Sequence, residues 1–404
     1  MIDRSQQVLL EAIKASLFNA KPTYPDDTDW DEVIKEAKNQ AVIGLISPVI
    51  PVHDESSDQG IAYYMRLLHE QDKLLKLLEA NNISCVILKG CAAAMYYPKP
   101  YLRSMGDVDF LVPHDQFDKA MDVLESNRYE YLHGKDENGK PIENARHVSY
   151  EKNGIEFELH HHFSSVGFNI DDLLEKAIDR KEYREINGYR FPVLPKIENG
   201  LVLLGHMYHH LKNDNLGLRQ IIDWEMYYHS VMNDEKWKQE FAPIAKRFGL
   251  FELAGNVNRM CEKHLALSKK KKEIDSTKHR EGIEDDRADK LLENLLTNGN
   301  FGVKKKPSSS NVESGKDIRD VMGIIKDKGL YSYFTDNGLA HSKLCQKHPA
   351  LTPVAFIFGF FRFLARGTTK IIKTGNYIEQ IRYLRERNKH DKDLGLRTKE
   401  NKKW

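Results

Sequence analysis

Two Asn-Gly dipeptides place the strongest constraint on how this chain folds. Asn153-Gly154 joins the stretches HVSYEK and IEFELH, and Asn187-Gly188 joins REI and YRFPVL. Asn and Gly readily adopt the positive φ angles of a two-residue hairpin turn, so each dipeptide predicts a pair of antiparallel strands. In IEFELH apolar and polar residues alternate, as in a strand with one buried face. The middle of the chain is therefore expected to form a sheet built largely from hairpins.

Hydrophobic residues with helical spacing lie on both sides of this sheet-forming part. Before it come SQQVLLEAIKASLF, DWDEVIKEAKNQAVIGLI with an Asp N-cap, and IAYYMRLLHEQDKLLKLLEANN. After Pro195 come NGLVLLGHMYHHLKN, LGLRQIIDWEMYYHSVMN and EKWKQEFAPIAKRFG. The expected fold class is α+β, with a mixed β-sheet, flanking helices and a mainly helical C-terminal region.

These patterns divide the 404 residues into five parts. We expect an N-terminal helical region at 1–80, an α/β domain at 81–195, a helical domain at 196–268, a charged and partly flexible linker at 269–320, and a C-terminal helical region at 321–404. The linker is rich in charge and poor in aromatic residues, around a short LLENLLTN helix. Contact with phosphate is the alternative for its basic runs.

The overall composition limits the partners and the compartment. The 61 basic and 60 acidic residues leave a net charge of +1, which makes long nucleic acid an unlikely partner. Four scattered cysteines and an N-terminus without a secretory signal favour the cytoplasm. The apolar stretch Pro353–Ala365 is too short to span a membrane, and we interpret it as a buried helix, with interfacial membrane contact as the alternative.

The stretch RSMGDVDFLV carries the clearest chemical signal. Asp107 and Asp109 stand two residues apart in an apolar run, so they share one face of a strand. Two carboxylates held so close repel each other unless a cation lies between them. Magnesium prefers oxygen ligands and commonly keeps substrate phosphates in its coordination shell. The pair therefore predicts a metal site, with an exposed edge strand as the alternative.

Two further stretches belong with this pair. The turn LKG, with Lys89 and Gly90, closes a buried strand and opens a short helix, so it can present N–H groups and an ammonium to phosphates. Gly90 permits close approach and unusual backbone angles. In IEFELH, Glu158 can supply a third carboxylate, and Glu156 competes for this role.

The order LKG, RSMGDVDFLV and FELHHH resembles the uncharacterised bacterial nucleotidyltransferases of the DNA polymerase β-like superfamily, over residues 25–230. The resemblance implies that Asp107, Asp109 and Glu158 bind the metal and act in catalysis. It also implies that the turn at Lys89 and Gly90 meets the nucleotide phosphates. This chain departs from the superfamily in the turn itself, usually Gly-Ser or Gly-Gly, in the longer gap to Asp107, and in a glutamate where aspartate is commoner.

Other residues are candidates for contact with the substrates. Arg103 can hold a phosphate or brace the loop, with a surface salt bridge as the alternative, and His160 can approach the nucleotide. A zinc site at His160, His161 and His162 is not expected, because adjacent residues of a strand diverge.

On the helical side, His206 and His210 lie one turn apart and can contact a phosphate or a metal, with packing as the blander interpretation. Arg219 and Asp223 are predicted to form an intrahelical pair, on a helix that the resemblance places at the cleft.

Together these features predict an enzyme. It would transfer a nucleoside monophosphate from an NTP, ATP included, to a hydroxyl acceptor and release pyrophosphate, with Mg²⁺ or Mn²⁺ as cofactor. The acceptor class stays open among small molecule, sugar and protein. The alternatives are a catalytically degenerate nucleotide-binding subunit of a toxin-antitoxin or biosynthetic complex, and a phosphotransferase that uses the same metal site.

Overall fold

The computed structural model describes residues 2–134, 147–163, 169–212, 216–265, 281–300 and 303–304, and farther along the chain residues 331, 335 and 352–357. The chain divides into two compact units, one of Met1–Lys304 with Leu394–Trp404 and one of Lys305–Asp393. The elements below all belong to the first unit. The five-part division drawn from the sequence stays a prediction.

A seven-stranded mixed sheet forms the centre of this unit, in the order β3-β4-β5-β2-β1-β7-β6. Strand β2 lies between β1, which is antiparallel to it, and β5, which is parallel. Strands β1 and β7 form the other parallel pair. The strands are β1 (Val86–Ile87), β2 (Val108–Leu111), β3 (Glu130–His133), β4 (His147–Lys152), β5 (Ile155–His160), β6 (Glu182–Ile186) and β7 (Tyr189–Val193).

Both predicted hairpins are confirmed. Strands β4 and β5 pair up to Lys152 and Ile155, and β6 and β7 pair up to Ile186 and Tyr189. Asn153 and Asn187 have φ angles of 55° and 52°, and the glycine after each is also in the positive region. The hairpins form because these turn residues adopt the left-handed conformation at little cost.

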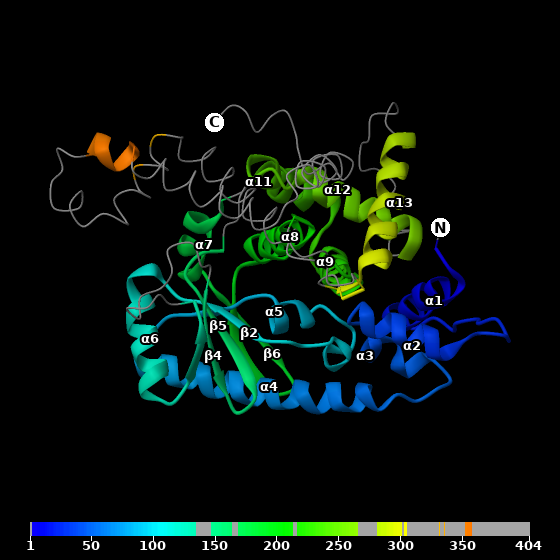
Figure 1. The fold of residues 1–404 in the computed structure, drawn as a ribbon, viewed down its shortest axis with the longest axis horizontal. Coiled ribbons are helices and arrows are strands. Elements are labelled where there is room, and N and C mark those ends of the chain that lie inside the picture. The colour runs from blue at the N-terminus through cyan, green and yellow to red at the C-terminus, as the bar shows by residue number, and fades with distance from the viewer. Residues whose placement is uncertain are drawn as a thin grey trace. The chain divides into compact units, whose positions relative to one another are not determined.

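Helices flank the sheet, which confirms the α+β class. Helix α4 runs along the sheet on the side away from α5, α8 and α9 (Figure 1). The larger helices are α1 (Arg4–Phe18), α2 (Trp30–Asn39), α4 (Glu55–Ala80), α6 (Phe117–Ser126), α7 (Asp171–Ile178), α8 (Lys196–Lys212), α9 (Leu218–Val231), α12 (Phe251–Met260) and α13 (Glu281–Asn298). The shorter ones are α3 (Ile43–Ile46), α5 (Gly90–Ala94), α10 (Asp234–Lys236) and α11 (Ala242–Arg247).

Two hydrophobic clusters hold these layers together. One packs Phe110 of β2 and Phe157 of β5 with Leu74 of α4 and Leu124 of α6. The other joins the N-terminal helices to α8, α9, α12 and α13. The first cluster buries the apolar faces of β2 and β5 completely, so the polar residues of these strands leave the opposite face.

Two expected helices differ in length. The stretch DWDEVIKEAKNQAVIGLI forms α2 and α3 rather than one helix, because Ala41 adopts a left-handed conformation with a φ angle of 54°. Helix α13 begins at Glu281 and is longer than the expected LLENLLTN segment. Ala288, which precedes the expected segment, is buried in the second cluster together with Leu291 and Leu295, which favours the longer helix.

Among the described residues, no helix is both long enough and apolar enough to cross a membrane. Residues 353–357 of the stretch Pro353–Ala365 are helical, and the rest of that stretch lies outside the described residues. The same holds for most of the expected linker and of the expected C-terminal helical region.

Candidate active site

Three carboxylates meet on the polar face of the central strands. Asp109 of β2 and Glu158 of β5 are register partners in parallel strands, so their side chains leave the sheet on the same face. Asp107 precedes β2 by one residue. An oxygen of each of these three residues lies within 4.8 Å of the others. The structure thus brings together the three carboxylates that the sequence singled out.

Lys89 lies against the same carboxylates. Its ammonium forms an ion pair with Asp109 Oδ1 and lies 3.8 Å from Glu158 Oε2, and its side chain is only 10% exposed. Lys89 also has a positive φ angle, 45°, which a side chain with a Cβ adopts only under strain. From the sequence we expected Gly90 to adopt the unusual backbone angles. In the structure the residue with the positive φ angle is Lys89, one position earlier. Gly90 itself lies beside the Asp107 backbone, since a Cβ added there would stand 3.5 Å from its carbonyl oxygen.

The charges of this group shift one another's protonation. Burial and the neighbouring Asp109 raise the pKa of Asp107. Burial alone would raise the pKa of Glu158, but its contacts with His160 and Lys89 lower it to about 2. Burial opposes the charge of Lys89, yet Asp109 and Glu158 raise its pKa. The lysine therefore balances part of the negative charge of the carboxylates at neutral pH.

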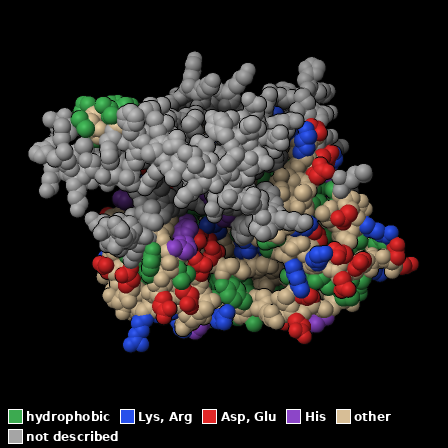
Figure 2. Space-filling view, in the orientation of Figure 1, with side chains coloured by type: hydrophobic (Ala, Val, Ile, Leu, Met, Phe, Trp, Pro, Cys, Tyr) green, Lys and Arg blue, Asp and Glu red, His purple; other side chains and the backbone are tan. Residues whose placement is uncertain are grey.

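Two histidines border the carboxylates on the side of β4. His160 Nε2 lies 2.8 Å from Asp109 Oδ1 and 3.3 Å from Glu158 Oε2, and the residue is buried. His147 of β4 is the register partner of His160, and its Nε2 lies 3.3 Å from Glu158 Oε1. Histidine and acidic side chains lie side by side on the face of the molecule shown in Figure 2. His147 was not among the residues that the sequence singled out, because a lone histidine in a strand carries no local signal.

A buried ion pair holds the loop that leads into Asp107. Arg103 donates to both oxygens of Asp223 on α9, each at 2.7 Å, and the Tyr97 hydroxyl donates to the same carboxylate at 2.7 Å. Arg219 donates to the Ser104 carbonyl oxygen at 3.3 Å. The salt bridge of Arg103 is therefore buried rather than exposed. Asp223 is bonded to Arg103 and Tyr97, in place of the intrahelical pair with Arg219 that the spacing suggested.

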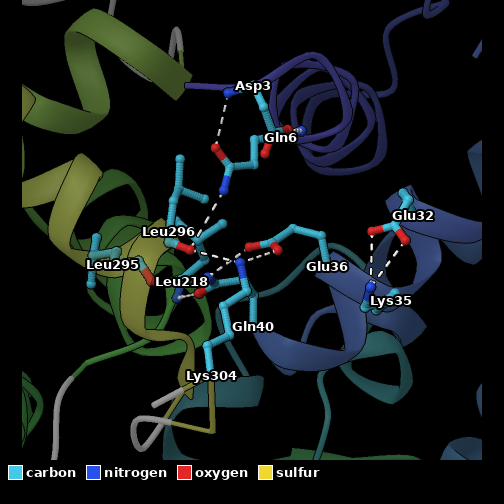
Figure 3. Close-up of polar contacts among 10 residues, drawn as sticks. All are labelled: Asp3, Gln6, Glu32, Lys35, Glu36, Gln40, Leu218, Leu295, Leu296 and Lys304. Atoms are coloured by element: carbon cyan, nitrogen blue, oxygen red, sulfur yellow. Dashed lines mark hydrogen bonds and ion pairs between the residues drawn. The ribbon is translucent and has the colours of Figure 1, made fainter. Parts of the chain in front are cut away.

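Helix α9 is itself fixed at its first turn by a buried glutamine. Gln40 Oε1 accepts from the Leu218 N–H at 3.0 Å, while its Nε2 donates to the Leu295 carbonyl of α13 and to Glu36, each at 3.0 Å (Figure 3). Lys304 completes the group through an ion pair with Glu36. These contacts join α2, α9 and α13, so the helix that carries Asp223 has a defined position.

A cavity of about 710 Å³ lies beside the loop that leads into Asp107. The Tyr63 hydroxyl donates to the Gly106 carbonyl, one residue before Asp107. The guanidinium of Arg66 lies 5.3 Å from the centre of the Tyr63 ring. The residues that line the cavity come from α4 and from the loop before β2, and are Gln59, Gly60, Ala62, Tyr63, Arg66, Ser104 and Met105.

The two histidines expected on the helical side lie on α8. The rings of His206 and His210 are in edge contact, with centroids 4.3 Å apart. The predicted spacing on one face of the helix is therefore present. Their role toward a substrate stays a prediction, as do the roles of Arg219 and Asp223.

The geometry suits a divalent cation held by oxygen ligands. Three carboxylates within 4.8 Å supply the donor type that Mg²⁺ prefers, and at least one of the three, Glu158, is ionised throughout the neutral range. Lys89 neutralises only part of the negative charge of the three carboxylates. The remaining negative charge attracts a divalent cation. The residues therefore fit the metal that the sequence predicted.

Comparison with protein families gives one match. The profile of a family described as uncharacterised nucleotidyltransferases matches residues 26–266, more than half of the chain. No curated protein matches the chain.

Two solved structures show partial similarity. The antibiotic-resistance factor ANT(2'')-Ia has a TM-score of 0.33 at 12% sequence identity, and the match covers 45% of this chain and 93% of the other. An antigenic nucleotidyltransferase-like protein from Paracoccidioides brasiliensis has a TM-score of 0.32 at 15% identity, and the match covers 50% of this chain and 89% of the other.

Proposed function

The chain belongs to this family of uncharacterised nucleotidyltransferases, and from that premise we propose that it transfers a nucleoside monophosphate from an NTP to a hydroxyl acceptor, with release of pyrophosphate. The observation that carries the proposal is the meeting of Asp107, Asp109 and Glu158 on one face of two parallel strands. These three residues would hold the divalent cation, with Mg²⁺ as the first choice and Mn²⁺ as its substitute.

The cation, when bound, supplies positive charge to the attacking and departing oxygens of an in-line displacement at the α-phosphorus. The protein groups do the rest. The carboxylates fix the position of the cation, and a carboxylate of the set accepts the proton of the attacking hydroxyl. The ion pair between Arg103 and Asp223 positions the loop that carries Asp107, so that the three oxygens stay in place while substrates bind.

The turn at Lys89 and Gly90 is our proposed contact for the β- and γ-phosphates. It lies beside the Asp107 backbone, as such a contact requires. The Lys89 ammonium is paired with Asp109. Where Asp109 holds the cation, the Lys89 ammonium would be available to the phosphates.

The cavity next to Gly106 is the proposed place for part of a substrate. Its aromatic ring at Tyr63 and the guanidinium of Arg66 suit a flat or acidic group. The opposite side of the loop is closed by α9, whose Arg219 reaches the Ser104 carbonyl oxygen. Nothing in this set of side chains selects one acceptor among sugar, small molecule and protein.

The position of the label in the product separates nucleotidyl transfer from its alternatives. The protein is incubated with Mg²⁺, a cell extract as the source of acceptor, and NTP labelled at either the α- or the γ-phosphorus. The proposal predicts that the α-label moves to the acceptor and that the γ-label leaves as pyrophosphate. Transfer of the γ-label with release of NDP would show a phosphotransferase, and binding of NTP without either product would show a degenerate nucleotide-binding subunit.

A further inference from the structure

His147, Glu158 and His160 form a second group of metal-ligand type, next to the all-oxygen group. A ligand atom of each of the three lies within 4.8 Å of the others. The group is built by the sheet, because His147 and His160 are register partners across β4 and β5, and Glu158 lies two residues before His160 on the same face. Adjacent histidines of one strand point apart, which is why the sequence did not predict zinc. His147 and His160 instead converge from two strands.

The two imidazoles lie close to the Glu158 carboxylate, each beside a different oxygen. His147 Nε2 and Glu158 Oε1 are 3.3 Å apart, and His160 Nε2 and Glu158 Oε2 are also 3.3 Å apart. An N–H···O hydrogen bond is usually about 2.9–3.0 Å long. Zinc bonds of about 2.0–2.1 Å in a tetrahedral site place neighbouring ligand atoms roughly 3.3–3.4 Å apart, and one ligand atom from each of the three side chains lies within 4.8 Å of the others.

The ligand types select a different ion from the neighbouring carboxylates. Imidazole nitrogen suits zinc and other divalent transition ions, whereas carboxylate oxygens suit Mg²⁺. Three protein ligands also leave a fourth tetrahedral position open, as in zinc sites that meet a substrate. The His147 side chain is 21% exposed and that of Glu158 is 15% exposed, so an ion can reach them from solvent.

The net charge nearby does not by itself select the second position. Asp107, Asp109 and Glu158 carry three negative charges when ionised, and Lys89 offsets one of them. A divalent ion among the carboxylates uses the remaining charge, so binding at the second group depends on its nitrogen ligands rather than on net charge. His160 Nε2 lies 2.8 Å from Asp109 Oδ1, so an ion bound at this nitrogen would take the place of that hydrogen bond.

We propose that His147, Glu158 and His160 bind a divalent transition ion, zinc by preference, at a position distinct from the Mg²⁺ position and joined to it through Glu158. This inference goes beyond the proposed function, because binding at this place does not require nucleotidyl transfer.

The test uses the full chain after removal of metals with a chelator and dialysis, titrated with Co²⁺ as a spectroscopic substitute for zinc. The visible absorption of Co²⁺ reports nitrogen ligation directly. Wild type is compared with His147→Gln, with Asp107→Asn, which alters only the all-oxygen group, and with His133→Gln. His133 is a matched control, an exposed histidine on the neighbouring strand β3. Circular dichroism checks the fold of each variant, and His147→Asn serves as a second variant of the same position.

The proposal predicts one Co²⁺ per wild-type chain, displaced by Zn²⁺ and retained in a large excess of Mg²⁺. The affinity for Co²⁺ should fall by about 10–100-fold in His147→Gln. It should stay at the wild-type level in His133→Gln and Asp107→Asn. Absence of Co²⁺ absorption in the folded wild type, equal affinity in His147→Gln, or loss in Asp107→Asn to the same extent would each overturn it. Mg²⁺-dependent nucleotidyl transfer is measured in a separate assay. Loss of the Co²⁺ result therefore does not affect the proposed function, and absence of transfer does not affect the proposed Co²⁺ and Zn²⁺ site.

Discussion

Lys89 is the residue at which charge and backbone strain coincide. Its ammonium pairs with Asp109, and its φ angle is positive at 45°. Removing the charge leaves three carboxylates close together with less compensation, and breaking a buried ion pair typically costs about 3–5 kcal/mol. We expect Lys89→Met to lower the free energy of unfolding by about 3 kcal/mol in metal-free buffer. Added Mg²⁺ should recover part of this loss, as measured by urea denaturation with and without chelator. Equal stability of the two proteins without metal would show that Lys89 does not neutralise the site.

The two glutamates of β5 provide a matched pair of variants. Glu158 is the register partner of Asp109, whereas Glu156 is 39% exposed and lies near His133. Glu158→Gln should reduce kcat by about 100-fold or more, since one ligand of the cation is lost. For Glu156→Gln, kcat should stay within about threefold of wild type, because kcat falls only when a contact made in the transition state is lost. Steady-state rates at saturating NTP measure both, and the reverse ranking would place the third carboxylate at Glu156.

Local residue patterns and long-range contacts differed in how far the sequence could predict them. The alternation in β5 predicted that Glu158 faces away from Phe157, and both Asn-Gly turns predicted their hairpins, because these effects act within a few residues. The pair of Lys89 with Asp109 depends on the pairing of β1 and β2, and the bonds of Arg103 to Asp223 join residues 120 positions apart. Neither leaves a local trace in the sequence, and the same is true of His147.

At the scale of elements, the packing of α8 against α9 depends on a glycine. A Cβ at Gly200 of α8 would collide with the ring of Tyr227 of α9, whose hydroxyl donates to the Lys196 carbonyl at 2.8 Å. Tyr227 is fully buried and has little room to move. Gly200→Ala should therefore lower the free energy of unfolding by about 1–3 kcal/mol, as overpacked cores do.

The control is Gly255 on α12, where an added Cβ meets nothing within 4 Å. Gly255→Ala should raise the free energy of unfolding by about 0.5–1 kcal/mol through helix propensity alone. Denaturant titration of both variants gives the comparison. A stable Gly200→Ala protein would mean that α8 and α9 are farther apart than the structure shows.

Element boundaries were harder to predict than element types. Apolar periodicity continues through Ala41, so the sequence suggested one helix where α2 and α3 are separate. Gln40 helps to explain the break, since its side chain bonds to Leu218 and Leu295. Such contacts come from other parts of the chain, and the helical pattern does not contain them.

At the scale of the whole molecule, stability should depend on pH through Glu225. Burial raises the pKa of Glu225 to about 7, although its contact with Cys261 opposes the shift. The folded protein then holds a proton that the unfolded chain releases near its ordinary value of 4.5. Stability from this group is complete below that value and is lost as the pH rises to about 7, with a total on the order of 3 kcal/mol.

Glu225→Gln removes this contribution to the pH dependence, since the amide cannot ionise. Unfolding free energies at pH 5 and pH 8 should differ less in the variant than in wild type. The difference between the two proteins isolates Glu225 from the other groups that titrate. An identical pH dependence in both would show that the pKa of Glu225 in the folded protein equals its ordinary value of 4.5.

The central claim is that the carboxylates on β2 and β5 carry nucleotidyl transfer. Its most direct measurement is the Mg²⁺-dependent release of pyrophosphate from NTP, in the presence of extract acceptor, by wild type and Asp109→Asn. The amide keeps the shape of the side chain, and Glu158 and Asp107 still compensate Lys89, so the variant should stay folded while its rate falls by about 100-fold or more. Pyrophosphate that appears only with wild type and Mg²⁺ is the predicted result. Release at the wild-type rate by folded Asp109→Asn would contradict the account.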